Sequence, residues 1–364
     1  MNKLFPIALA VAVALAAVAA SRPAATQELT TVEKLYADLS KLSPDERNQR
    51  LIDGAKKEGE VVLTSGYSGK EGIAHLMLFE KRYGVKVKFV NVSSQQSVEQ
   101  MIQETTAGRI LTDIASVSGP DLGPIIQHNI GARNPTPATK AILSPYQGFN
   151  DPTGQNRWIP WYATSHGIGY NPSIMKDEDA PKSWQDLCNP KYKNQMSFET
   201  LEVRMLLGLY FMFDRDVEKV RQFLECIGKN EPIVMKGHTT RMTLLLAGDH
   251  PLSPDLLIYR GVYDNRRNPK KAPFKVVYSA PVFMDTSDWV INKRAPHPNA
   301  AALFVDWSLG EESQRYMFDQ FRETLSYRHP FFPDNVQIVT ANFADPSVVD
   351  TLSDYWKRYL GAKR

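Results

Sequence analysis

A short polar loop at residues 63–72, LTSGYSGKEG, is the first stretch whose residue types could hold a ligand. A nucleotide-binding P-loop needs a glycine, four residues and then Gly-Lys-Ser/Thr, but Thr64 replaces the first glycine and Glu71 follows the lysine. The dinucleotide fingerprint GxGxxG is absent because the glycines of the loop are evenly spaced. The nucleophile elbow GxSxG is absent because Ser68 directly precedes a glycine. The loop is therefore either one wall of a reversible binding cleft or an ordinary turn.

The segments around this loop predict strands and helices in alternation. Strands are expected at residues 61–64, 85–90 and 113–117, with helices between them at residues 73–83 and 98–107. This order predicts a parallel sheet with right-handed crossovers, and such sheets bind ligands at the carboxyl ends of their strands. The loops after the first and third strands then share one edge, which favours the cleft-wall interpretation. Their candidate ligand-binding residues are Ser65, Gly66, Tyr67, Ser68, Ser118 and Gly119.

Length and charge limit the class of protein. The chain has 364 residues, which is enough for two domains. Its formal net charge is only +3, and no basic tract could follow a phosphate backbone. Nucleic acid is therefore not an expected partner.

The N-terminus has the layout of a secretory signal peptide, assigned to residues 1–26. A basic start precedes an apolar, alanine-rich run at residues 4–20 and then small polar residues. Cleavage is expected between Ala19 and Thr26, which predicts a soluble mature protein in the periplasm. The alternative is a membrane anchor, for which the run is short.

Cys188 and Cys226 are the only cysteines. In an oxidising compartment they can form a disulfide, and two buried free thiols are the equal alternative. A zinc site is not expected because further ligands at suitable spacing are missing.

The middle of the chain differs from its first part. Residues 134–160 are rich in Pro, Gly, Asn and Gln and predict irregular structure, and a proline interrupts the aromatic stretch at residues 158–162. Strands and helices resume after residue 167, with further strands expected at residues 256–259 and 288–291. We expect a second α/β lobe here, after which the chain returns to the first lobe.

Several stretches, in their order, resemble the extracellular solute-binding proteins of ABC importers, in the branch that includes the ferric-iron-binding proteins. They are AKKEGEVVL at residues 55–63, FEKRYGVKV at 79–87, DIA at 113–115, GYN at 169–171, APKSWQDL at 180–187 and PNAA at 298–301. The resemblance covers about residues 32–330 and rests on the order of these stretches.

The resemblance implies a two-lobed α/β fold in which each lobe is a mostly parallel sheet flanked by helices, with a ligand cleft between the lobes. It implies an N-terminal helical arm at residues 27–57, a first lobe from residues 58–163 plus 274–322, and a second lobe from residues 164–273 plus 323–364. It also implies a monomer that binds a small molecule, needs no cofactor and hands its solute to the permease subunits of an ABC importer.

The resemblance places further ligand-binding residues in the second lobe, where helix N-termini and hydroxyl side chains suit anions. They are Ser165, Glu199, Thr200, Thr239, Tyr259 and Arg260. Iron-binding members use two adjacent tyrosines near this point, whereas here Ile258 precedes Tyr259. No metal ligand is therefore expected, and Tyr259 is the candidate if iron does bind.

An anionic organic solute or a metal chelate is the favoured ligand, because Arg260 could pair with it bidentately. The alternative for Arg260 is a solvated surface residue. Arg204 and Arg241 are expected to be interlobe or surface charges rather than ligand contacts.

Two other classes remain open, an exported enzyme and a ligand-sensing subunit of a membrane receptor. No HExxH motif or Ser-His-Asp order is found by spacing, so no catalytic residues are expected. A sensor subunit would share the fold and the cleft.

Overall fold

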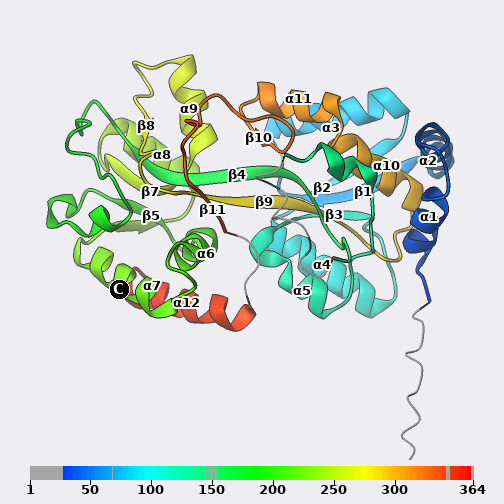
Figure 1. Cartoon of the computed structure of the whole chain (residues 1–364), viewed down its shortest axis with the longest axis horizontal. Helices are drawn as coiled ribbons and strands as arrows, with labels where there is room; N and C mark the ends of the chain where they lie inside the picture. The colour runs from blue at the N-terminus through cyan, green and yellow to red at the C-terminus, as the bar shows by residue number, and fades with distance from the viewer. Residues whose placement is uncertain are drawn as a thin grey trace, which may run out of the picture.

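The computed structural model describes residues 28–361 except 68, 144–145, 147–150, 152–153 and 342–344. The expected signal peptide and Ser68 thus lie outside the described residues. Two groups of helices and strands lie side by side along the long axis of the molecule (Figure 1). None of the helices in the described part of the chain has the length and apolar character needed to cross a membrane.

The N-terminal arm consists of two capped helices, α1 (Thr31–Leu39) and α2 (Pro44–Glu58). The predicted helix start at Ser43 is confirmed, since its hydroxyl and the Glu46 side chain form a capping box. Arg47 of α2 forms an ion pair with Asp306 of α10 (Pro298–Ser308), which fixes the arm to the first lobe.

The first lobe contains the predicted parallel sheet. Its early elements are β1 (Glu60–Ser65), α3 (Gly69–Tyr83), β2 (Lys86–Asn91), α4 (Ser94–Ala107), β3 (Ile114–Ser118), the 3₁₀ turn η1 (Gly119–Asp121), α5 (Gly123–Gln127) and η2 (Pro137–Ala141). Strand β1 pairs in parallel with both β2 and β3, so the carboxyl ends of β1 and β3 meet at one edge.

Two long antiparallel strands, β4 (Ile159–Tyr170) and β9 (Val282–Ile291), run through both lobes (Figure 1). The sheet order is β10-β4-β9-β3-β1-β2, where β10 is Glu323–Thr324. The expected irregular structure up to residue 160 is wrong at its end, because β4 begins at Ile159 and includes Pro160. The pairing with β9 shifts between Pro160 and Tyr162, and such a bulge admits a residue without an N–H.

The second lobe is built on the other halves of β4 and β9. Its elements are η4 (Gln185–Cys188), η5 (Pro190–Tyr192), β5 (Ser197–Glu199), α6 (Val203–Met212), α7 (Val217–Lys229), β6 (Ile233–Met235), α8 (His238–Ala247), β7 (Leu252–Leu257), α9 (Ile258–Arg267), β8 (Lys275–Val276), β11 (Ile338–Thr340) and α12 (Pro346–Tyr359). The strand expected at residues 256–259 is wrong at its end, since it stops at Leu257 and Tyr259 lies in the first turn of α9. A short apolar run does not distinguish a strand end from a buried helix start.

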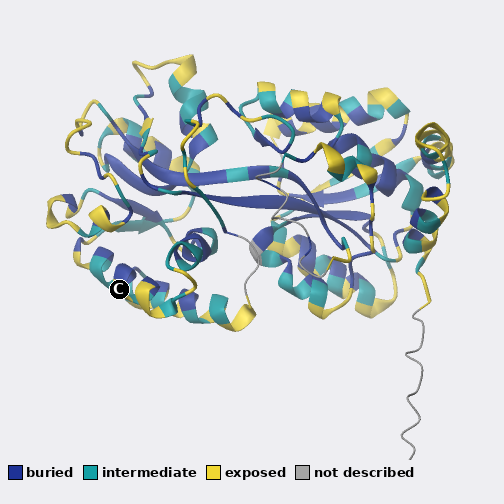
Figure 2. Cartoon of the chain, viewed as in Figure 1, coloured by how far each residue is buried: buried dark blue, intermediate teal, exposed yellow. Residues whose placement is uncertain are grey.

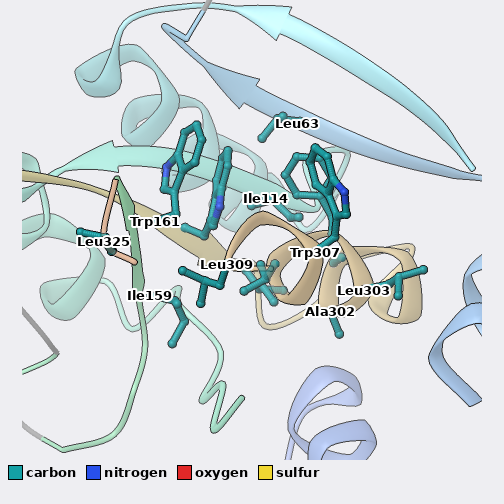
Figure 3. Packing of buried hydrophobic residues seen from close by; sticks show 14 of the residues in the cluster. Leu63, Ile114, Ile159, Trp161, Ala302, Leu303, Trp307, Leu309 and Leu325 are labelled. Carbon is teal, nitrogen blue, oxygen red and sulfur yellow. The ribbon is translucent and has the colours of Figure 1, made fainter. Parts of the chain in front are cut away.

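Each lobe has its own apolar core, and the central strands are buried along most of their length (Figure 2). Ile159 and Trp161 of β4 pack in the first core near Leu309, which follows α10 (Figure 3). Residues 323–364, expected as one part of the second lobe, divide in their packing. Leu325 lies in the first core, whereas Trp356 lies in the second.

Cys188 and Cys226 form a disulfide that joins η4 to α7 within the second lobe. Of the two alternatives for the cysteines, the structure therefore has the bonded pair.

Candidate functional site

The loop between β1 and α3 is held at both ends. The backbone N–H of Tyr67 donates to the Ser65 hydroxyl at 3.0 Å. Gly69 begins α3 with a φ of 87°, which glycine adopts without strain. At Gly72 a Cβ would lie 2.9 Å from the carbonyl oxygen of Tyr67, so the absent side chain lets the helix pack closely on the loop. Tyr67 is thereby fixed in position, with only 6% of its surface exposed.

Arg322 lies among three tyrosines that come from different parts of the fold. Its guanidinium carbon is 4.4 Å from the ring centroid of Tyr259. The corresponding distances are 5.3 Å to Tyr67 and 6.0 Å to Tyr162. Tyr67 follows β1, Tyr162 lies on β4, and Tyr259 lies in α9, so the positive charge is held where both lobes meet. Arg322 and these three tyrosines are called the Arg322 cluster below.

The charge of Arg322 has no ion-pair or hydrogen-bond partner among the described residues, and the side chain remains partly exposed. Burial acts to lower the pKa of Arg322, but the surrounding tyrosines, first Tyr259, raise that pKa by more. Burial also raises the pKa of Tyr67 and of Tyr259, so both phenols keep their protons. The Arg322 cluster therefore offers one cation and neutral O–H donors, a set that suits a carboxylate or phosphate.

A second group of charges comes from the second lobe. Glu202 caps α6, and the Nε of Arg204 lies 3.3 Å from Oδ2 of Asp285 on β9. The Nε2 of His238, the first residue of α8, lies 3.3 Å from Oε2 of Glu202. Burial acts to raise the pKa of Glu202, but the Arg204 charge and the His238 contact bring that pKa well below its usual value. The charge of Arg204 is thus balanced by two acids, unlike that of Arg322.

The first-lobe loop after β3 approaches this second group. The hydroxyl of Ser94 donates to Asp121 and accepts the backbone N–H of Ser118 at 2.8 Å. Burial raises the pKa of Asp121, and the Ser94 hydroxyl and the Arg204 charge act against that rise. Asp121 and Arg204 therefore affect each other from opposite lobes.

Beneath the second group lies a layer of buried polar side chains. The Nδ1 of His166 on β4 is 3.1 Å from Oδ1 of Asp255 on β7. Burial lowers the pKa of His166 and raises that of Asp255 well above its usual value. Arg241 is fully buried and donates to the Ser253 hydroxyl at 3.0 Å, so a surface position for Arg241 is wrong.

The predicted first-lobe residues form one edge of the site. Tyr67 joins the Arg322 cluster, and the Ser65 hydroxyl supports Tyr67. Gly66 is exposed beside Tyr67, whereas Gly119 is buried after Ser118 at the end of β3. These placements leave the roles of Ser65, Gly66, Ser118 and Gly119 in ligand binding as predictions.

The predicted second-lobe residues are less uniform. Tyr259 joins the Arg322 cluster, but Arg260 is exposed and donates to Asp264 at 3.0 Å. Glu199 accepts the backbone N–H of Gly237 at 2.9 Å, which ties β5 to the start of α8.

The remaining three predicted second-lobe residues all carry a hydroxyl group. Ser165 is fully buried and donates to Glu323, so its hydroxyl is already engaged. Thr200 and Thr239 are exposed. Ligand contact by any of these three also remains a prediction.

Arg322 and Tyr162 are the residues that the sequence analysis missed. Arg322 stands in no recognisable motif, and Tyr162 lies at the end of the aromatic stretch at residues 158–162, which a proline interrupts. The sequence carries little signal for Tyr162, because β4 is buried along most of its length and so lacks the polar–apolar alternation of a half-exposed strand.

Comparison with known proteins defines the class. The sequence profile of the bacterial extracellular solute-binding proteins matches residues 78–346. The chain belongs to this family, a transport family whose members bind small solutes outside the cytoplasm and work with ABC importers. It has their two-lobed fold with the ligand cleft between the lobes.

Three proteins illustrate what the chain is similar to. An Fe(3+)-binding periplasmic protein of Serratia marcescens is 23% identical over 243 residues, which is 66% of this chain and 70% of that protein. The periplasmic binding protein AfuA of Actinobacillus pleuropneumoniae, solved with fructose 6-phosphate, is 16% identical with a TM-score of 0.68 and covers 83% of this chain and 98% of its own. A Trichodesmium protein, solved with iron and citrate, is 14% identical with a TM-score of 0.66 and covers 84% of this chain and 100% of its own.

Proposed function

We propose that this protein captures a small anionic solute, or a metal chelate with free carboxylates, and delivers it to the permease of an ABC importer. The observation that carries the proposal is the Arg322 cluster, in which a cation without an ion pair to any described residue lies beside the phenols of Tyr67, Tyr162 and Tyr259. A guanidinium binds carboxylate and phosphate groups through paired N–H donors, and the phenol hydroxyls add further donors.

The ligands of two structural relatives support this chemistry. One relative is solved with fructose 6-phosphate and another with iron and citrate. Both fructose 6-phosphate and citrate present anionic oxygens. A phosphosugar and a ferric chelate are therefore natural members of a first ligand panel.

A bare ferric ion fits the Arg322 cluster poorly. Arg322 places a positive charge 4.4 Å from the ring of Tyr259, where a metal would have to approach the phenol. Burial raises the pKa of Tyr259, which opposes formation of the phenolate that iron needs. Within the described part of the chain, no three His, Cys, Asp or Glu side chains are placed to hold a metal.

Thermal unfolding against a panel tests the proposal. The panel contains citrate, ferric citrate, inorganic phosphate, sulfate and fructose 6-phosphate, with fructose, spermidine and Fe(III) as contrasts. A ligand bound only by the native state at 100 times its dissociation constant stabilises that state by about 2.7 kcal/mol, which is readily measured. We expect a shift from at least one anion and none from fructose or spermidine.

Matched arginine variants locate the binding. Arg322→Gln should lower the affinity for that anion at least about tenfold, because a charge-assisted pair is lost. Arg315→Gln is the control, since Arg315 also lies over a tyrosine, 4.6 Å from the ring centroid of Tyr327, but is exposed outside the cluster. A shift from spermidine alone, or equal affinity in wild type and Arg322→Gln, would contradict the proposal.

We also propose that the chain is exported as a monomer, with cleavage between Ala19 and Thr26. The disulfide in the second lobe supports an oxidising compartment. The intact mass of the protein recovered from the periplasm would identify the new N-terminus, and an uncleaved chain would contradict the cleavage.

A further inference from the structure

The residue after Arg322 is a buried acid, Glu323, on strand β10. Only 2% of its surface is exposed. The hydroxyl of Ser165 on β4 donates to Oε1 of Glu323, while Oε2 is buried and has no hydrogen-bond partner in the part of the chain that the structure describes. A carboxylate in this position has one oxygen that accepts a hydrogen bond and one that is buried without a protein donor among the described residues.

Arg322 and Glu323 lie on opposite faces of the sheet edge. Arg322 points toward Tyr67, Tyr162 and Tyr259, whereas Glu323 contacts Ser165. Adjacent residues of an extended segment alternate in this way. The two side chains form no ion pair, yet they remain close enough that each charge acts on the other.

Burial raises the pKa of Glu323 to about 7, and the Ser165 hydroxyl and the Arg322 charge limit that rise. The other ionisable groups around Glu323 are Tyr146, Tyr259, Tyr278, Arg266 and Arg328. The three phenols have raised pKa values through burial, so they stay neutral in this range. Arg266 and Arg328 are exposed. Glu323 is therefore the group whose charge changes near neutral pH.

We infer that Glu323 takes up a proton when an anionic solute binds at Arg322, so that the protein binds its solute more tightly as the pH falls. The inference rests on the proposed anion site. An anion that neutralises Arg322 removes the nearby positive charge that favours ionised Glu323, and it adds a negative charge in its place. Glu323 acts here through Arg322 and is a positioning residue, without contact to the solute.

The electrostatic coupling can be measured without any ligand. Carbon-13 NMR of labelled glutamate carboxyls follows the titration of Glu323 between pH 5 and 9, with Glu323→Gln identifying its signal. In Arg322→Gln the midpoint of Glu323 should rise by about one unit, because the guanidinium charge is gone. Arg315→Gln should leave the midpoint unchanged. An unchanged midpoint in Arg322→Gln would overturn the inference.

Calorimetry then measures the proton itself. The probe is whichever of citrate, sulfate or fructose 6-phosphate binds most tightly, titrated in two buffers of different ionisation enthalpy. Wild type should take up more protons on binding than Glu323→Gln does. When the pH rises from 6 to 8, the affinity of wild type for the probe should also fall about tenfold more than the affinity of Glu323→Gln falls. The comparison with Glu323→Gln cancels protons taken up by the ligand.

The outcomes separate this inference from the proposed function. Binding with equal proton uptake in wild type and Glu323→Gln overturns the inference and leaves the anion site intact. If no anion in the panel binds, the proposed function fails, and the inference about solute binding falls with it whatever the NMR titration shows.

Discussion

The buried acids of this protein differ in how far neighbouring charges offset the effect of burial on their pKa values. Glu202 stays ionised because Arg204 and His238 are close, and its pKa is held well below the usual value. Burial raises the pKa of Asp255 and of Asp288 well above the usual value. Glu323 lies between these extremes, which makes it the acid with a measurable effect on stability near neutral pH.

Glu323 should make the fold less stable as the pH rises. Its pKa of about 7 in the folded protein exceeds the unfolded value of 4.5, so the folded state binds the extra proton between these pH values. The stabilisation of the fold by protonated Glu323 is fully present below pH 4.5 and is lost as the pH rises to 7. Between pH 4 and pH 8, the free energy of unfolding of wild type should fall by about 3 kcal/mol more than that of Glu323→Gln.

Urea denaturation of both proteins at several pH values measures this difference. Because every other ionisable group is shared, the difference reports Glu323 alone. Parallel stability curves for the two proteins would show that Glu323 ionises normally in the folded state.

Tyr259 and Arg260 should differ in their effect on solute binding. Tyr259→Phe removes a hydroxyl from the Arg322 cluster and should weaken binding of the anion several-fold, about the value of one hydrogen bond. Arg260→Ala should have the smaller effect, because the Arg260 side chain is 51% exposed and already paired with Asp264. Isothermal titration of both variants checks the order, and a larger loss at Arg260 would place the anion outside the cluster.

The site was only partly predictable from the sequence. Tyr67 and Tyr259 were predicted because they stand beside recognisable strand ends and family-like stretches. Arg322 was not, because a positive charge gains its role from three tyrosines that are distant in sequence. Ser165 is the opposite case. Its place near the lobe crossing made it a predicted ligand contact, but its hydroxyl already donates to the buried acid Glu323.

At the scale of elements, the sequence predicts best where local signals agree. The capping box at Ser43 and the alternation in β2 both follow from neighbouring residues. Strand β4 was missed at its start because Pro160 normally argues against a strand, and only the bulge against β9 explains it. The start of α9 was missed because its first residues are apolar and continue the run of β7.

The disulfide between η4 and α7 should stabilise the second lobe. The bond joins cysteines 38 residues apart, and closing such a loop in the unfolded chain contributes about 3–4 kcal/mol. We expect the double variant Cys188→Ser with Cys226→Ser to unfold at a lower urea concentration, with a free energy of unfolding reduced by that amount. Wild type measured with reductant is the control and should match the double variant, whereas equal stability of wild type and variant would contradict the prediction.

At the scale of the whole molecule, β4 and β9 are the members that both lobes share. Lobe closure on a solute must therefore bend these two strands around the Arg322 cluster. We expect small-angle X-ray scattering to show a smaller radius of gyration when the preferred anion is added. Arg322→Gln at the same anion concentration is the control and should show no change, and an unchanged radius in wild type would mean that binding occurs without closure.

The order of strands in the sheet also has a consequence for how the chain is made. The first half of β4 pairs with β9 and β10, which follow it by more than a hundred residues, whereas β7 and β8 pair with its second half. The first lobe therefore lacks central partners until most of the chain has been synthesised, and pairings so distant in sequence form slowly. We expect a polypeptide that completes its sheet this late to stay unfolded for longer after synthesis, and an unfolded chain is the form that a secretion channel can thread across a membrane.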